Sequence, residues 1–199
     1  MMAINLLLVV SLYIYTTSAL FFNTGPHKLT YTDCSKSPKK LIHVVESSVH
    51  LNPYPVQIPG HLTVDGSLQI LGPISGHNLK AHVLIKKKLL GNYQKVPCVA
   101  NVGSCTYDVC DLIGEGSNDQ CADYYLKNHF PCHCPLPNGT FSFAPTSFTI
   151  PEATGAFSWI ASGEYTVDVQ LVDESTKEEK GCYHVDIELE DKSGGFLFG

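Results

Sequence analysis

Apolar and polar residues alternate with a period of two in four stretches of the 199-residue chain. Successive side chains of a β-strand point to opposite faces, so this alternation predicts strands with one face buried and the other in water. The expected buried faces carry Leu62, Val64, Leu68 and Ile70 in the first stretch, Leu79, Ala81, Val83 and Ile85 in the second, Tyr165, Val167, Val169 and Leu171 in the third, and Tyr183, Val185, Ile187 and Leu189 in the fourth.

Proline and glycine separate these stretches, in segments such as "NPYPVQIPG", "LGPISG" and "CPLPNG". No long stretch has helical periodicity, although a short helix is expected within "CADYYLKNHF" at 121–130. The charged segment "DESTKEEKG" at 173–181 is expected to form a solvated turn between the last two strands. The predicted fold class is therefore all-β: an antiparallel sandwich or cup in a single domain.

Both ends of the chain are expected to lie outside this domain. Residues 1–19 form an uncharged, apolar stretch that ends in the small residues "TTSA", which is typical of a secretory signal peptide. A membrane anchor is the less favoured interpretation, because the apolar run is short for a bilayer span. Residues 20–33 are expected to lead into a β domain at 34–190, and 191–199 to form a flexible tail.

The charge of the chain argues against a nucleic-acid partner. The net charge is −6 and every basic residue is lysine, whereas nucleic-acid recognition favours a basic face and forked arginine contacts. The nine histidines matter in acid: adding nine charges to −6 gives +3, which favours contact with anionic membranes in an acidic compartment. Scattered, solvated histidines without a function are the alternative.

Eight cysteines in a secreted chain predict four disulfides. Six of them crowd into 98–134, including the pair in "FPCHCPLPNGT". Cys132 and Cys134 flank His133 too closely for an ordinary zinc chelate, and they lack the Cys-x-x-Cys spacing of a redox pair. Disulfides are therefore favoured over a metal site, although eight cysteines allow 105 pairings. Asn138 begins an Asn-Gly-Thr glycosylation sequon, which fits the same secretory route.

No catalytic residue, metal or cofactor is expected. The chain lacks the Gly-x-Ser-x-Gly, His-Glu-x-x-His and phosphate-loop motifs. Asp108 and Asp111 beside Cys110 form a possible carboxylate pair, but their loop context favours capping of a turn.

The whole pattern resembles the GM2 ganglioside activator family. The resemblance rests on "NPYPVQIPGHLTVDGS", "VPCVANVGSCTYDVCD", "FPCHCPLPNGTFSF" and a late "GC", and it runs from about Cys34 to about Leu189. It implies a β-cup with an apolar lipid cavity, in a protein that takes glycosphingolipids from membranes and presents them to a soluble lysosomal glycosidase without being an enzyme. It also implies the disulfide pairs Cys34–Cys182, Cys98–Cys105, Cys110–Cys134 and Cys121–Cys132.

The resemblance also implies two apolar loops at the rim of the cup that touch the membrane. They are "LLGNYQKVPC" and "FTIPEATGAFSWIASG", and their expected contact residues are Leu89, Leu90, Tyr93, Phe148, Ile150, Phe157, Trp159 and Ile160. Tyr93 stands where the family carries Trp, and the family's usual sequon after the Pro-Gly turn is missing. Core packing is the alternative role for Trp159, and for "KKK" at 86–88 the alternatives are contact with anionic lipid headgroups or a polar strand edge.

These departures leave other functions open. The expected partners are a glycosphingolipid or other membrane lipid, a membrane surface touched transiently and a soluble glycosidase, in the lysosomal lumen or outside the cell. The alternatives are a general carrier of phospholipid or sterol, and a secreted lipid-sensing interaction module.

Overall fold

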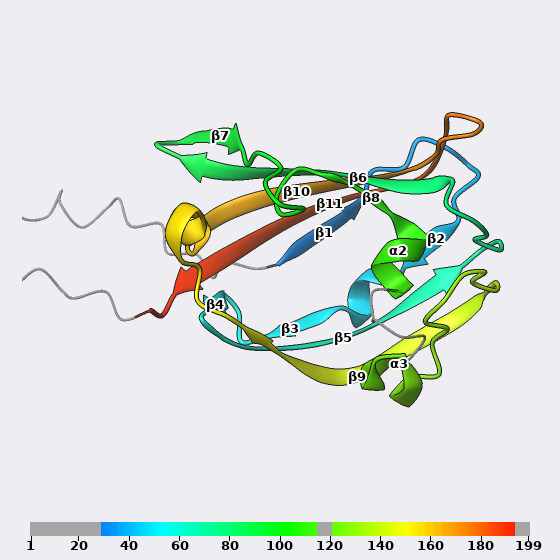
Figure 1. The fold of residues 1–199 in the computed structure, drawn as a ribbon, viewed down its shortest axis with the longest axis horizontal. Helices are drawn as coiled ribbons and strands as arrows, with labels where there is room; N and C mark the ends of the chain where they lie inside the picture. The colour runs from blue at the N-terminus through cyan, green and yellow to red at the C-terminus, as the bar shows by residue number, and fades with distance from the viewer. Residues whose placement is uncertain (1–28, 115–120, 194–199) are drawn as a thin grey trace, which may run out of the picture.

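Two β-sheets face each other in the computed structural model, which describes residues 29–114 and 121–193 (Figure 1). The larger sheet has the order β1-β11-β10-β6-β7, with β4 parallel to β11 and β8 antiparallel to β6. Its strands are β1 (Thr30–Asp33), β4 (Val56–Ile58), β6 (Leu79–Leu89), β7 (Asn92–Lys95), β8 (Thr106–Asp108), β10 (Gly163–Asp173) and β11 (Glu178–Asp191). The smaller sheet has the order β2-β5-β3, with β9 also paired to β5, and consists of β2 (Ile42–Val44), β3 (His50–Asn52), β5 (Gly60–Ile70) and β9 (Gly139–Ile150).

The strand register explains the alternation in the sequence. Strand β10 lies between β6 and β11. Its pairing with β6 begins at Tyr165↔Lys87, and its pairing with β11 begins at Gly163↔Leu189. Side chains of equal parity therefore share the inner face, because opposed residues of paired strands point the same way. The expected inner positions Leu79, Ala81, Tyr165, Leu171 and Tyr183 are buried. The all-β fold class is confirmed. Among the described strands, every pairing is antiparallel except that of β4 with β11, which is parallel.

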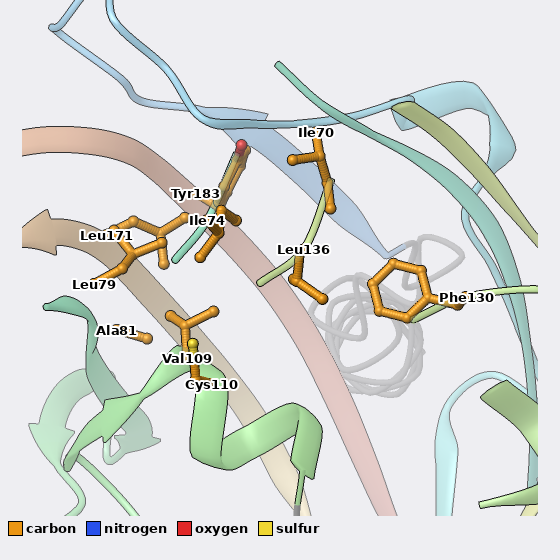
Figure 2. Packing of buried hydrophobic residues seen from close by; sticks show 10 residues of the cluster. All are labelled: Ile70, Ile74, Leu79, Ala81, Val109, Cys110, Phe130, Leu136, Leu171 and Tyr183. Carbon is orange, nitrogen blue, oxygen red and sulfur yellow. The ribbon is translucent and has the colours of Figure 1, made fainter. Parts of the chain in front are cut away.

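The packed core lies at one end of the two sheets. Figure 2 shows its side chains converging from the ends of β5 and β10, the starts of β6 and β11, and the adjoining loops. The cluster consists of Ile70, Ile74, Leu79, Ala81, Val109, Cys110, Phe130, Leu136, Leu171 and Tyr183. The Tyr183 hydroxyl donates a hydrogen bond to the carbonyl of Ile42 and so joins the two sheets at this closed end. Burial raises the pKa of Tyr183 to about 12, which keeps this donor protonated.

The short helices lie beside this core. Helix α3 (Asp123–Lys127) falls within the segment expected to be helical, and the turn between β10 and β11 falls within 173–181. Helix α2 (Val109–Gly114) follows β8, and Asp108 Oδ1 accepts hydrogen bonds from the backbone N–H of Cys110 at 2.8 Å and of Asp111 at 3.2 Å. Asp108 thus caps the start of α2, as its turn context indicates. Two 3₁₀ turns, η1 (Glu46–Ser48) and η2 (Gly155–Ile160), complete the described elements.

Four disulfides join the strands and loops. The bonded pairs are Cys34–Cys182, Cys98–Cys105, Cys110–Cys134 and Cys121–Cys132, the same pairs that the resemblance implied. Cys132 and Cys134 bind different partners, so neither thiol remains to ligate a metal beside His133. The first bond links the end of β1 to β11, and the third links α2 to the segment before β9.

The two ends of the chain are described only in part. The expected signal peptide at 1–19 and residues 20–28 and 194–199 lie outside the described residues. The described chain enters the larger sheet at Thr30, four positions before the domain boundary expected at Cys34, and β11 ends at Asp191. Among the described helices, none is long and apolar enough to cross a membrane.

Candidate functional site

An apolar cavity of about 410 Å³ lies between the sheets at the end opposite the core. This end is open and lies at the left of Figure 1. Here β4 pairs with the end of β11, and the start of β5 pairs with the end of β9. The side chains that line the cavity come from both sheets and from the loops of the mouth. They are Ile58, Ile85, Val96, Val102, Ile150, Pro151, Glu152, Ala153, Ile160, Tyr165, Val167, Ile187 and Leu189, together with Gly103.

The wall of the cavity continues the inner face of the larger sheet. Ile85, Val167 and Ile187 lie two or more positions along their strands from the packed core residues, with the same inward parity. Two of the residues expected at the rim, Ile150 and Ile160, also line this space. An apolar wall of this kind suits hydrocarbon, because it offers dispersion contacts and few polar groups to desolvate.

The β6–β7 hairpin lies at the mouth (Figure 1), and it carries exposed apolar side chains. Its turn consists of Leu90 and Gly91, with φ of 50° and 83°, between the paired residues Leu89 and Asn92. The Leu90 side chain is fully exposed, at 103% of its reference area, and Leu89 and Tyr93 are also exposed. This hairpin is the first of the two loops expected at the rim, and all three of its expected residues face solvent.

The second loop contains η2, the yellow turn at the mouth in Figure 1. Trp159 is 43% exposed, which contradicts the alternative role in core packing. The ring nonetheless has a neighbour inside the cup, because Lys87 Nζ lies 5.7 Å from its centroid. The Phe157 side chain lies outside the described part of the structure. Phe148 is exposed and packs edge-on against Tyr124 of α3, with ring centroids 5.7 Å apart.

A third loop at the mouth was not expected from the sequence. Cys98 and Cys105 close a tight hairpin in which Val99 and Val102 exchange two backbone hydrogen bonds of 2.8 and 2.9 Å. Both valines are exposed and apolar, and Val102 also lines the cavity. Gly103 has φ of 104°, and a Cβ there would lie 2.1 Å from the carbonyl oxygen of Pro97, so only glycine fits. The seven-residue cysteine spacing was the available signal, since it implies a small rigid loop.

The three lysines at 86–88 do not form a single basic patch. Lys86 and Lys88 point to the outer face of the sheet and pair with Asp168 at 3.7 Å and Glu164 at 2.8 Å. Lys87 points inward and is buried. Strand β6 pairs with β7 at all three lysines and with β10 at Lys86 and Lys87, so the polar-edge interpretation is wrong for these two.

A larger hollow of about 700 Å³ lies at the side of the cup, between β1 and the segment of η1 and β3. Its lining includes Glu46, His50 and Tyr54, so an acyl chain there would lie against polar atoms. The smaller cavity at the mouth is therefore the better candidate for an apolar ligand. Asn138 is exposed next to the Gly139↔Ile70 pair, at the closed end and away from both spaces.

Comparison with known proteins identifies the family. Residues 28–189, most of the chain, match the family model of the ML domain. The chain belongs to the ML-domain family. Two relatives named Ganglioside GM2 activator match this chain, one from Mus musculus at 31% identity over 144 residues and one from Macaca fascicularis at 32% over 126 residues. The first match covers 71% of this chain and 72% of the mouse protein, and the second covers 61% and 64%.

The comparison with solved structures gives low TM-scores. A Niemann-Pick type C2 protein from Japanese carpenter ant has a TM-score of 0.39 at 12% identity and covers 81% of this chain and 99% of its own. Chicken MD-1 complexed with lipid IVa has a TM-score of 0.33 at 10% identity, with 81% and 88% covered.

Proposed function

We propose that this chain is a non-enzymatic lipid-binding protein that takes a glycosphingolipid from a membrane into its cavity and presents it to a soluble glycosidase of the β-hexosaminidase type. The observation that carries the proposal is an apolar cavity whose mouth bears exposed Leu90, Tyr93 and Trp159. The name Ganglioside GM2 activator, borne by relatives at 31% and 32% identity, supports an activator and a sphingolipid cargo.

The energetics of such a cavity favour reversible exchange. Each CH₂ group gains roughly 0.8 kcal/mol on leaving water, but its free energy changes little between a bilayer and an apolar cavity. Acyl chains can therefore move in either direction if they avoid water on the way. Exposed apolar side chains at the mouth lower that barrier when they enter the membrane surface, and Trp and Tyr suit this interface because their rings are amphipathic. Membrane contact is then peripheral and transient.

The compartment we propose is the secretory pathway, ending in the lysosomal lumen or outside the cell. The four disulfides support an oxidising route. A glycan on Asn138, at the closed end, would leave the mouth free for the membrane. Protonation of histidines in an acidic lumen would reduce the net negative charge of −6 and weaken repulsion from anionic lipids.

Lipid extraction from vesicles tests this function. The purified, oxidised protein is mixed at pH 5 and pH 7 with vesicles that carry labelled ganglioside or labelled phospholipid, and protein-bound label is measured after the vesicles are removed. We expect ganglioside extraction that is stronger at pH 5 and weaker in Trp159→Ala, and stimulation of ganglioside hydrolysis when a β-hexosaminidase is added. Equal extraction of all lipids without stimulation indicates a general carrier instead. No extraction of any lipid contradicts the proposal and favours an interaction module.

A further inference from the structure

A buried lysine stands at the mouth where the strand pattern calls for an apolar residue. Lys87 follows Leu79, Ala81, Val83 and Ile85 on the inward face of β6, and it is 8% exposed. Lysine is almost never this buried unless its ammonium group has partners. Burial alone lowers the pKa of Lys87, which reports the desolvation of its charge.

The partners of Lys87 come from the rim segment and from β10. Its Nζ donates a hydrogen bond to the carbonyl oxygen of Trp159. The same atom lies 5.7 Å from the centroid of the Trp159 ring and 5.6 Å from that of Tyr165, within the range of cation–π attraction. The neighbouring lysines instead meet carboxylates on the outer face, so Lys87 differs from them in both direction and chemistry.

Two adjacent carbonyls of η2 accept hydrogen bonds from side chains of the larger sheet. The Tyr165 hydroxyl donates to the carbonyl of Ile160 at 2.8 Å, next to the Trp159 carbonyl that Lys87 holds. The last carbonyls of a helix have no intrahelical donors, so side chains from β6 and β10 supply them here. Gly163, at φ of 114°, closes the segment: a Cβ there would lie 3.1 Å from Lys87 Cε. The C-terminal end of η2 is thus fixed to the sheet.

We infer that Lys87 is a positioning residue for the rim: its ammonium group fixes the end of η2 and holds the Trp159 ring half-exposed, in the orientation in which it meets a membrane. The consequence for membranes rests on the proposed function, whereas the effect on the Trp159 ring does not. A ring that is already ordered loses less entropy on entering the interface, so the lysine should strengthen vesicle binding by between about 2-fold and 10-fold.

Trp159 is the single tryptophan of the chain, so its fluorescence reports this segment alone. The test compares acrylamide quenching and anisotropy of Trp159 in the lipid-free wild type, Lys87→Met, Lys87→Arg and Lys86→Met. Methionine keeps the length without the charge, arginine keeps the charge, and Lys86 is the matched control on the outer face of the same strand. We expect roughly twofold stronger quenching and lower anisotropy in Lys87→Met, recovery toward wild type in Lys87→Arg, and no change in Lys86→Met. Wild-type quenching and anisotropy in folded Lys87→Met would overturn the inference.

A measurement on the wild type covers the case in which Lys87→Met does not fold. Amine acetylation at pH 8, read residue by residue by mass spectrometry, should modify Lys86 and Lys88 well before Lys87. Equal rates at the three positions would overturn the inference. Both readouts are made without lipid, so failure of lipid extraction would remove the proposed function while leaving the role of Lys87 intact, and failure here would leave the proposed function standing.

Discussion

Leu90 allows membrane affinity and fold stability to be changed in opposite directions. It occupies the first position of the two-residue β6–β7 turn, at φ of 50°, and Gly91 occupies the second, at φ of 83°. Two-residue hairpin turns with both φ values positive prefer Asn-Gly, because asparagine tolerates the left-handed region that strains other side chains. Replacing Leu90 by Asn should therefore raise the free energy of unfolding, by about 1 kcal/mol.

The same substitution should weaken membrane binding. The Leu90 side chain is fully exposed in the free protein, so it is buried only when the hairpin enters a membrane. Burial of a leucine side chain is worth about 1.5–3 kcal/mol, which corresponds to a loss of about 10- to 150-fold in vesicle affinity for Leu90→Asn. Leu71 offers a matched control, because it is exposed next to Ile70 at the closed end of the cup.

Vesicle flotation at pH 5 and chemical denaturation give the two quantities. We expect Leu90→Asn to bind vesicles more weakly and unfold at higher denaturant concentration, while Leu71→Asn binds vesicles as the wild type does. If Leu90→Asn and Leu71→Asn bind vesicles equally well, the hairpin does not enter the membrane. If Leu90→Asn unfolds at lower denaturant concentration than the wild type, the strain argument at this turn is refuted.

Three further predictions follow from other parts of the structure. Val167→Phe narrows the cavity and should abolish lipid retention while vesicle flotation persists; retained lipid at wild-type stoichiometry would contradict it. The hydrogen bond that the His184 Nδ1–H donates to Asp168 raises the pKa of His184. The stabilisation from this pair is therefore full below the pKa of the unfolded state and is lost as pH rises through the pKa of the folded state. His184→Gln should therefore lower stability, by up to about 1 kcal/mol, at pH 5 and less at pH 8.5, and a pH-independent loss in denaturant titrations would refute this. Replacing Cys34 and Cys182, 148 residues apart, with alanine should cost about 5 kcal/mol in the chain-entropy model, and a loss below about 1 kcal/mol in the same titrations would count against it.

The fold was predictable from the sequence because burial on one side of a strand leaves a period-two pattern. The disulfide pairing was not, since spacing alone leaves 105 possibilities and only the family resemblance selected among them. The short helix α3 was predictable as an element, because its segment breaks the strand alternation.

The cavity could not be predicted from the alternation. Val167 and Leu171 lie on one face of β10 and read alike in the sequence, but Leu171 is packed and Val167 faces open space. The difference arises because Ile74 and Leu136, from loops, fill the closed end (Figure 2). The loop residues at the mouth, such as Val102 and Ala153, line the cavity without filling it. The role of Lys87 was not predicted either. The alternation places Lys87 on the inward face of β6, but only the fold brings the Trp159 carbonyl and Tyr165 to its ammonium group.

The most direct test of the account is to locate the acyl chain of a bound lipid. A ganglioside with a photoreactive diazirine near the end of its acyl chain is loaded from vesicles at pH 5, irradiated, and its attachment sites are mapped by mass spectrometry. The account predicts attachment to the inward residues of the cavity wall, Ile85, Val167 and Ile187, and loss of attachment in Val167→Phe. Attachment confined to the outer faces of the sheets or to the side hollow near Tyr54 would contradict it.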